Sequence, residues 1–523
     1  MQPVSGPALV TDYLNGVPSA LEFYGSDPRE LESYRRRAES VTRRFDAAAR
    51  ARAAEALTPT SPTARQRLER FVEEGGVMVT TGQQAGLLTG PLFTIYKALT
   101  AARLAQELER RLGMLVLPVF WTASEDHDWE EVNHAYLSIV RDGIRRVQLT
   151  RAPSVPTPMS HVLIDDDARI ILEESSDFLV GNTDNEYLLN WIREAYRPEK
   201  SVAGAFTELL GRLLAPFDFC MTDAAHPAVK RGSAGLLAEA LERSREHERL
   251  LAERTRAIES AGYRGQVAVL EGATNVFRYG PAGRERIYRD GDGYRVGEGT
   301  EPMTPAALHQ ELEADPGRFS PNVFLRPVVE SAVFPTISYV GGPGEINYFA
   351  QIAGLFPAFG MEPPVVAPRA SLLLVEMPMR RLLEKLELEP EQLARPRHEL
   401  VELLAQDSVP DTVRSTLTEL GRSLTEGYRI LIEESKRIDP TLEGALARLR
   451  NEALTRVSES EKKITQHIKR KEGVRIGQLD RLLAHLRPDG KPQDRVLNVI
   501  PFLGRHGLSL LTRIYEEIRV DLR

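Results

Sequence analysis

Short apolar runs and a helical pattern alternate along the first quarter of the chain. Residues 76–81 (GVMVTT) are mostly apolar and lead into a glycine-rich turn, and residues 91–112 carry apolar side chains at helical spacing. A second apolar run, residues 114–122, ends in an acidic cluster. The order strand, turn, helix and strand predicts a βαβ unit of a parallel sheet, a fold that binds ligands at the carboxyl ends of its strands.

Patterns further along the chain predict the elements that surround this unit. Residues 30–57 are rich in Arg, Ala and Glu and predict one helix. Alternating apolar and polar residues, together with paired turn residues, predict two β-rich insertions at about 136–200 and 275–320. Further short strands are predicted at residues 217–221, 323–325 and 336–340.

The pattern changes at about residue 376. Between residues 413 and 438, and again between 442 and 468, apolar side chains recur mostly three or four positions apart, and Asp439-Pro440 separates the two runs. Two long amphipathic helices with narrow apolar seams predict an antiparallel coiled-coil hairpin. The expected parts are an α/β core at 1–375, a helical coiled-coil region at 376–486 and a segment at 487–523 that returns to the core.

Size and composition limit the class of protein. A chain of 523 residues exceeds the size at which single cores stop growing. The net charge of −8 and the lack of a basic tract argue against nucleic acid or an anionic membrane as the main partner, and the apolar runs are too short to cross a bilayer. The single cysteine, Cys220, excludes an internal disulfide, and with no signal-peptide pattern at the N-terminus it predicts a cytoplasmic protein.

The first candidate for chemistry is the turn between the first strand and its helix, TTGQQAGLLTGP. Three glycines allow backbone amides to approach a ligand closely, and the helix that follows offers partial positive charge to an anion. The spacing matches neither the dinucleotide fingerprint nor the lysine-bearing phosphate loop, and a tight connection without a ligand is the alternative. The predicted nucleotide- or anion-binding residues here are Thr81, Gly82, Gln83, Gln84, Gly86, Thr89 and Gly90.

The second candidate is the acidic cluster after the next strand. Asp126, His127, Asp128 and His134 are predicted catalytic residues, suited to acid–base work, to binding an amine or to a divalent ion. The two histidines are seven residues apart, which could bring both to one helix face. The alternative is the acidic start of a helix, where Asp and Glu are common in any case.

A third candidate combines a glycine-rich turn with an arginine upstream. The turn GGPGE follows a predicted strand, and its carboxylate could bind an amine; a turn that only needs open backbone angles is the alternative. Arg326 suits a carboxylate or phosphate, or else a structural ion pair. The predicted substrate-binding residues are Asn322, Arg326, Tyr339, Gly341, Gly342, Gly344, Glu345 and Tyr348.

Weaker signals complete the set. Asp223, His226 and Lys230 follow a predicted strand and could line the same site, although a solvated helix start explains them as well. Lys491 and Arg495 lie in a basic loop that could hold a phosphate, with solvated charge as the alternative. Cys220 lies in an apolar strand and is expected to be buried filler rather than a nucleophile.

Five long motifs give the chain a family resemblance. They are TTGQQAGLLTGPLFTIYKA, PVFWTASEDHDWEEVNH, FLRPVVESAVFPTISYVGGPGEINYFAQ, VVAPRASLLLVE and GKPQDRVLN. In this order they resemble the cysteine ligases of bacillithiol biosynthesis, the BshC family, and the likeness runs from about Asp12 to the C-terminus.

The resemblance implies a Rossmann-like core with connecting-peptide insertions, distantly similar to class I aminoacyl-tRNA synthetases, and a coiled coil that forms a homodimer. The implied reaction joins the carboxyl group of cysteine to the amine of glucosaminyl malate. It calls for ATP or another nucleotide, with Mg²⁺ left open and no zinc expected. In this scheme residues 82–90 cradle an anion, the group Asp126, His127 and Asp128 recognises or deprotonates an amine, and Arg326 and Glu345 orient the malyl sugar.

The chain also departs from the synthetase pattern. No His-x-Gly-His motif follows the first strand, and no lysine–serine loop is evident, so routes that release AMP or ADP are both open. Two other classes of function remain: a metal-dependent amidase or other hydrolase built on Asp126, His127 and Asp128, and a non-catalytic assembly protein whose coiled coil is its purpose.

Overall fold

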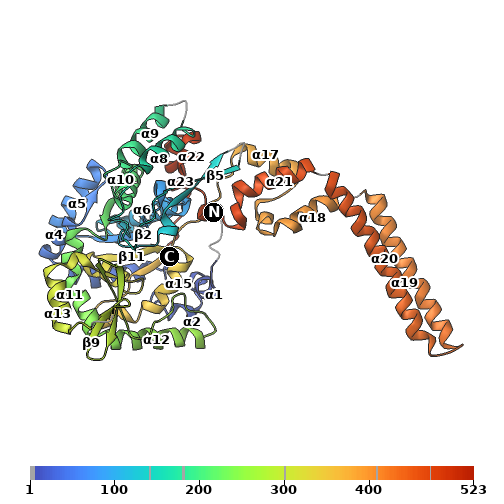
Figure 1. The fold of residues 1–523 in the computed structure, drawn as a ribbon, viewed down its shortest axis with the longest axis horizontal. Coiled ribbons are helices and arrows are strands. Elements are labelled where there is room, and N and C mark those ends of the chain that lie inside the picture. The colour runs from blue at the N-terminus through green and yellow to red at the C-terminus, as the bar shows by residue number, and fades with distance from the viewer. Residues whose placement is uncertain (1–5, 140–142, 180–182, 300–301, 408–409, 472) are drawn as a thin grey trace. The chain divides into compact units, whose positions relative to one another are not determined.

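A computed structural model describes residues 6–139, 143–179, 183–299, 302–407, 410–471 and 473–523 of the chain. The chain forms two compact units (Figure 1). The first contains Met1–Ile139, Arg145–Leu373 and Asp494–Arg523, and the second contains Val140–Ile144 and Leu374–Gln493.

A six-stranded sheet forms the centre of the first unit. Its order is β1-β6-β3-β2-β11-β12, and all neighbours are parallel except β1, which pairs antiparallel with β6. The strands are β1 (Thr58–Pro59), β2 (Val77–Gln83), β3 (Val116–Thr122), β6 (Cys220–Asp223), β11 (Thr336–Gly341) and β12 (Val365–Pro368). Helix α6 (Leu92–Leu112) connects β2 to β3, which confirms the predicted βαβ unit.

The apolar runs in these strands reflect their burial. Every residue of β3 is buried, and β2 is buried up to Gln83, because helices cover both faces of a parallel sheet. The chain moves outward from β2 through β3 to β6 and then returns to β11 on the other side of β2. The carboxyl ends of β2 and β11 therefore mark the switch point where Rossmann-like folds bind ligands.

The two insertions have different structures. Residues 275–320, predicted to be β-rich, contain helix α13 (Pro305–Ala314) and contribute to a four-stranded antiparallel sheet of order β10-β7-β8-β9. Its strands are β7 (Ala273–Gly280), β8 (Gly283–Asp290), β9 (Gly293–Val296) and β10 (Phe319–Pro321). The β-rich prediction is wrong for most of residues 136–200. Among the described residues there, only β4 (His134–Ile139) and β5 (Gly143–Gln148) are strands, and they are followed by the helices α8 (Asp167–Ser176) and α9 (Thr183–Ala195). In α9 the buried residues Leu188 and Ile192 are four positions apart, which is helical spacing.

Two further expectations need correction. Residues 30–57 form two helices rather than one, α3 (Leu31–Arg44) and α4 (Ala47–Glu55), because Asp46 caps the second by accepting a hydrogen bond from the Ala49 amide at 2.8 Å. Residues 323–325 are not a strand. Asn322 Oδ1 instead accepts hydrogen bonds from the amides of Phe324 and Leu325, at 3.0 and 3.1 Å, and leads the chain into α14 (Arg326–Val333).

The remaining helices of the first unit pack around these sheets. They are α1 (Ala8–Asn15), α2 (Pro18–Leu21), α5 (Pro62–Glu74), α7 (Trp129–Val132), α10 (Val202–Leu214), α11 (Pro227–Glu242), α12 (Ser244–Ser260), α13 (Pro305–Ala314), α15 (Pro343–Ile352), α16 (Leu355–Ala358), α22 (Ile500–His506) and α23 (Ser509–Glu517). The C-terminal segment joins this core where the Leu92 amide donates to the Leu497 carbonyl at 2.8 Å.

The second unit is helical. It contains α17 (Met377–Leu386), α18 (Arg397–Asp407), α19 (Asp411–Lys436), α20 (Leu442–Lys471) and α21 (Gly473–Leu486). Helices α19 and α20 run side by side as a long antiparallel pair (Figure 1), which confirms the predicted hairpin. Several apolar side chains of the pair stay about half exposed, among them Ile430, Leu431 and Leu449.

Candidate active site

The glycine turn after β2 is packed too closely for side chains at two of its positions. A Cβ atom on Gly82 would lie 2.7 Å from the carbonyl oxygen of Trp121 in the neighbouring strand. A Cβ atom on Gly86 would lie 2.9 Å from the Cα atom of Gly90. These glycines are therefore required by packing between backbones, whether or not a ligand is bound.

The second half of this turn is filled by the protein itself. The Leu88 amide donates to the Tyr196 hydroxyl at 2.6 Å, and Asn498 Nδ2 donates to the carbonyl oxygens of Leu88 and Gly90, both at 2.8 Å. Leu88 and Thr89 have φ angles of 53° and 77°, and both are fully buried. Residues 86–90 therefore have the geometry of a tight connection, while Gln83 and Gln84 lie half-buried at the edge of the sheet.

A buried lysine joins this turn to the glycine turn after β11. Lys97 of α6 is 1% exposed, and its Nζ donates to the carbonyl of Gly82 and to Glu345 Oε2, the latter at 2.6 Å; Gln83 Oε1 is 3.3 Å away. Glu345 also accepts from the Gly342 amide at 2.8 Å and from the Tyr339 hydroxyl at 2.6 Å. Burial alone would raise the pKa of Glu345. The charge of Lys97 and these hydrogen bonds have the larger combined effect and lower the pKa below its ordinary value, so the carboxylate is charged.

The predicted substrate-binding arginine lies in the same buried network. Arg326 NH1 donates to Glu330 Oε2 at 2.9 Å, and NH2 donates to the Tyr348 hydroxyl at 3.1 Å. Its guanidinium carbon lies 5.2 Å from the centre of the Tyr339 ring. Glu330 is 2% exposed and accepts a hydrogen bond from Thr80 of β2, and burial raises the pKa of this carboxyl group. Arg326 thus forms a structural ion pair in this structure.

The second glutamine of the turn leads to the acidic cluster. Gln84 Nε2 donates to Asp126 Oδ2 at 2.7 Å, and Asp126 Oδ1 accepts from the backbone amide of His127 at 2.7 Å. His127 Nδ1 lies 3.0 Å from NH1 of Arg284 on β8. Burial lowers the pKa of the His127 imidazole, and the Arg284 charge lowers it further. The cluster is therefore tied both to the turn after β2 and to the inserted sheet.

Two arginines of the inserted sheet stack on one phenylalanine. The guanidinium carbons of Arg284 and Arg286 lie 3.9 and 4.6 Å from the centre of the Phe277 ring, and the His127 ring centre lies 6.0 Å from it. Arg284 donates to Ser320 Oγ and to the Pro321 carbonyl, each at 2.9 Å. None of the described carboxylates lies within 4.0 Å of either guanidinium, so the two positive charges have no direct counter-ion.

The end of β6 contributes further polar groups. Ser124 donates to Asp223, which also accepts from the Ala225 amide at 2.8 Å, and burial raises the pKa of Asp223. Lys230 of α11 is buried against Glu125 and also donates to the Phe319 carbonyl. His226 caps α11 by accepting from the Ala228 amide at 3.2 Å. Asp223 and Lys230 are thus part of the buried support around the acidic cluster.

Other predicted residues lie outside these contacts. His134 begins β4 and bonds Asn133, and α7 contains only four residues, so the idea that both histidines share one helix face is wrong. Asp128 is exposed, as are Lys491 and Arg495. Gly344, in the first turn of α15, lies near Gln266. Cys220 is buried, as expected, and burial raises the pKa of its thiol to about 12.

Four functional candidates were missed by the sequence analysis. Lys97 is the one charged residue in the buried first half of α6, residues 92–102, and that signal could have identified it. Arg284 and Arg286 carry no comparable signal, because Arg284 contacts His127, which is 157 residues away along the chain, and Arg286 stacks on Phe277 of the neighbouring strand. The fourth is Arg369, which forms a buried ion pair with Asp494 at 2.6 Å. This pair joins two of the five motifs that give the chain its family resemblance.

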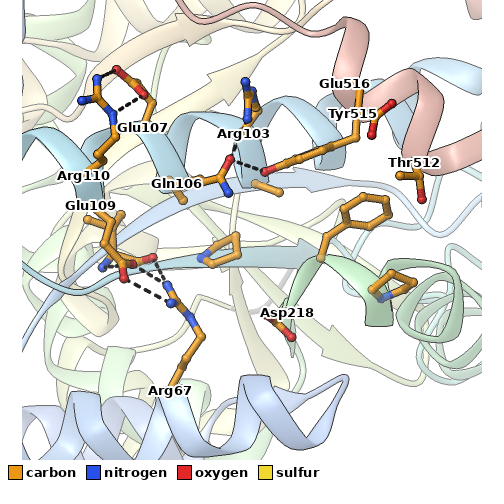
Figure 2. A pocket seen from close by; sticks show the side chains of 16 residues that line it. Arg67, Arg103, Gln106, Glu107, Glu109, Arg110, Asp218, Thr512, Tyr515 and Glu516 are labelled. Carbon is orange, nitrogen blue, oxygen red and sulfur yellow. Dashed lines mark hydrogen bonds and ion pairs between the residues drawn. The ribbon is translucent and has the colours of Figure 1, made fainter.

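A cavity of about 970 Å³ lies at the opposite end of β3, near Val116 and Pro118 (Figure 2). Figure 2 shows that its charged residues are largely satisfied within the protein: Arg67 pairs with Glu109, and Tyr515 donates to Gln106 at 3.0 Å. None of the predicted site residues lines it.

In the described part of the chain, no three His, Cys, Asp or Glu side chains are placed to hold a metal ion together. Across the same residues, no helix combines the length and the apolar character needed to cross a membrane.

Comparison with known proteins gives matches along nearly the whole chain. Residues 2–370 match the family model described as "Bacillithiol biosynthesis BshC, N-terminal Rossmann-like domain", and residues 372–520 match "Bacillithiol biosynthesis BshC, C-terminal coiled-coil domain". A protein of Solibacter usitatus named "Putative cysteine ligase BshC" is 32% identical over 98% of this chain and 95% of its own length. A protein of the same name from Koribacter versatilis is 31% identical over 87% of this chain and 84% of its own length. One from Bacillus anthracis is 27% identical over 97% of this chain and 95% of its own length.

Among solved structures, one titled as a putative arginyl tRNA synthetase from Campylobacter jejuni aligns over 88% of this chain and 98% of its own. It is 11% identical with a TM-score of 0.24, values too low to support any conclusion.

Proposed function

The chain belongs to the BshC family of bacillithiol biosynthesis, and from this premise we propose that it is a ligase that joins the carboxyl group of cysteine to the amine of glucosaminyl malate. The curated relatives carry the name of a cysteine ligase. The amide-forming step on this pair of substrates, as the last step of bacillithiol biosynthesis, is the proposal.

One observation supports this proposal most: two adjacent glutamines, Gln83 and Gln84, connect positively and negatively charged groups at the switch point. Gln83 faces Lys97 and, through it, the Glu345 carboxylate, whereas Gln84 bonds Asp126 and, through it, reaches His127 and Arg284. A ligase for an amino acid and a malyl sugar must bind an ammonium group and several carboxylates close together. The partly exposed carboxylates of Asp126 and Glu345, together with the arginines of β8 that lack counter-ions, provide both kinds of partner.

We assign the groups as follows. Asp126 and Glu345 bind the amine-bearing ends of the substrates, since about a third and a quarter of their side chains are exposed. Arg286 binds a carboxylate, because no described acidic group pairs with it. Holding two substrates in register converts a bimolecular step into an intramolecular one, and this positioning is the main contribution to rate.

The reaction needs an activated carboxyl group, so the proposal includes ATP or another nucleotide, with Mg²⁺ as its companion ion and no zinc. Release of AMP would indicate an adenylate, and release of ADP would indicate an acyl phosphate. The proposal also includes a homodimer in the cytoplasm, formed through the half-exposed apolar residues of α19 and α20, such as Leu431 and Leu449.

The test is incubation of the purified full chain with cysteine, glucosaminyl malate and ATP, with mass spectrometry of the thiol product and of the released nucleotide. The proposal predicts formation of bacillithiol in the wild type and in an Arg249→Gln control, whose side chain is exposed on α12, and strong loss in Asp126→Ala. Absence of product with every nucleoside triphosphate, from protein that binds both substrates, would contradict it.

A further inference from the structure

The contact between His127 and Arg284 fixes which ring nitrogen carries the hydrogen. A guanidinium has five N–H donors and no acceptor, so the atom that faces it must be a lone pair. Arg284 NH1 lies 3.0 Å from His127 Nδ1. Burial lowers the pKa of Arg284 to about 10, which leaves it protonated at neutral pH. Nδ1 is therefore the acceptor, and the hydrogen of the neutral ring lies on Nε2.

Arg284 is itself held in place on every side. Its Nε donates to Ser320 Oγ and its NH2 donates to the Pro321 carbonyl, while its plane lies over the Phe277 ring. The residue is 8% exposed. A group anchored by two hydrogen bonds and a stacked ring cannot swing away to accommodate a hydrogen on Nδ1.

The neighbouring carboxylates do not reverse this assignment. Asp126 Oδ1 lies 4.0 Å from Nδ1, beyond hydrogen-bond distance, and it already accepts from the backbone amides of His127 and Asp128 at 2.7 and 3.3 Å. Its Oδ2 is taken by Gln84. The charges that act on His127 are Arg284 and Arg286, which oppose its protonation, and Asp126 and Asp128, which favour it; the pKa of the ring is lowered overall.

This arrangement has the opposite polarity to the histidine–aspartate pair of many enzymes. There a carboxylate accepts from Nδ1–H, and Nε2 is left as a lone pair that acts as a base. Here an arginine donates to Nδ1, so Nε2 presents an N–H. Within the described part of the chain Nε2 has no hydrogen-bond partner, and 30% of the side chain is exposed.

We propose that Arg284 is a positioning residue that keeps His127 neutral with its hydrogen on Nε2, and that His127 donates a hydrogen bond to an oxygen of the substrate instead of accepting a proton from its amine. The part that concerns the substrate rests on the proposed ligase function. The oxygen that gains negative charge when the amine attacks the activated carboxyl group is the kind of partner that such a donor stabilises.

The first test needs no activity. Protein labelled with ¹⁵N at histidine is studied by long-range ¹H–¹⁵N correlation, and the His127 signals are assigned by their loss in His127→Gln. We expect the pattern of the Nε2–H tautomer, and a titration midpoint below the ordinary histidine value of 6.5. In Arg284→Met the midpoint is expected to rise, whereas the exposed control Arg249→Met leaves it unchanged.

An Nδ1–H pattern in the wild type would overturn the inference. So would an unchanged midpoint in a folded Arg284→Met protein. If Arg284→Met does not fold, the wild-type spectrum still decides the tautomer.

The second test compares two variants of His127 in the ligase reaction. Glutamine keeps an N–H near the position of Nε2 but cannot take up a proton, and alanine has neither property. A donor role predicts that His127→Gln stays within about tenfold of the wild-type kcat and that His127→Ala loses about 10²–10³-fold, the usual loss for one oxyanion donor. Equal losses in two folded variants would show a base and contradict the proposal. Absence of product from the wild type would refute the ligase function alone, since the tautomer is measured without it.

Discussion

The two sides of the switch point differ in how their charges are balanced. At the carboxyl end of β11 the buried charges pair directly, Lys97 with Glu345 and Arg326 with Glu330. On the β8 side Arg284 and Arg286 stack on Phe277 and face neutral groups and a histidine. Buried charges are costly unless paired. The pairs on the β11 side therefore hold the two glycine turns together and leave only the partly exposed Glu345 for a ligand, whereas the β8 side keeps its positive charges available.

The largest expected effect is on the β11 side. Lys97→Met leaves the Glu345 carboxylate without its buried partner, and loss of one member of such a pair costs about 3–5 kcal/mol. The measurement is the free energy of unfolding in urea, with Arg249→Met as the exposed control. The double variant Lys97→Met/Glu345→Gln is expected to lose much less than the sum of the two single losses. A Lys97→Met protein as stable as the control would show that the buried pair does not hold the two turns together.

A smaller loss of stability is expected at the glycine turn. The Cβ of Gly82→Ala would press on the backbone oxygen of Trp121, which cannot move without shifting β3, and such overpacking costs about 1–3 kcal/mol. The matched control is Gly235→Ala on α11, where nothing lies within 4 Å, and alanine there should stabilise the helix slightly. Thermal unfolding of both variants should shift in opposite directions; equal shifts would show that the turn tolerates a side chain.

The β8 side should show an effect on binding instead of stability. Arg286→Gln removes a charge that no described acid neutralises, so the free energy of unfolding should change little. The Kd for glucosaminyl malate should rise about tenfold, equivalent to about 1.4 kcal/mol. Isothermal titration calorimetry gives the Kd, and Arg286→Lys is expected to fall between the wild type and Arg286→Gln. A large loss of stability with unchanged affinity would reverse the roles of the two sides.

The smallest expected effect is a dependence of stability on pH. The folded-state pKa of Glu345 lies below its ordinary value of 4.5, so the stabilisation is complete above pH 4.5 and is lost as the pH falls through the lower folded-state pKa. The acid-side slope of stability against pH should therefore be shallower in Lys97→Met/Glu345→Gln than in the wild type. Identical slopes from pH 5 to pH 3 would show that Glu345 is not held by its partners.

Much of the fold could be predicted because it follows from short-range patterns. The apolar runs of β2 and β3, the helical spacing of α6 and the paired seams of α19 and α20 each lie within one segment of chain. The pattern failed at residues 167–195, where a few polar and apolar positions fit strand and helix almost equally well.

The candidate site was predicted less completely, because its geometry depends on residues distant in the sequence. The turn at 82–90 has the composition of an anion cradle, yet Tyr196 and Asn498 fill its second half from 108 and about 410 positions away. Arg326 has the composition of a ligand-binding residue, yet Glu330 one helical turn later neutralises it. The sequence therefore does not reveal which arginine lacks a counter-ion, because that depends on how distant segments fold together.

Hydrogen–deuterium exchange of the full chain, with and without saturating glucosaminyl malate, tests most directly whether the β8 side holds the ligand. Protection on binding is expected at residues 83–84, 124–131 and 284–288. Protection confined to residues 102–110 and 512–516, which line the cavity at the other end of β3, would contradict it.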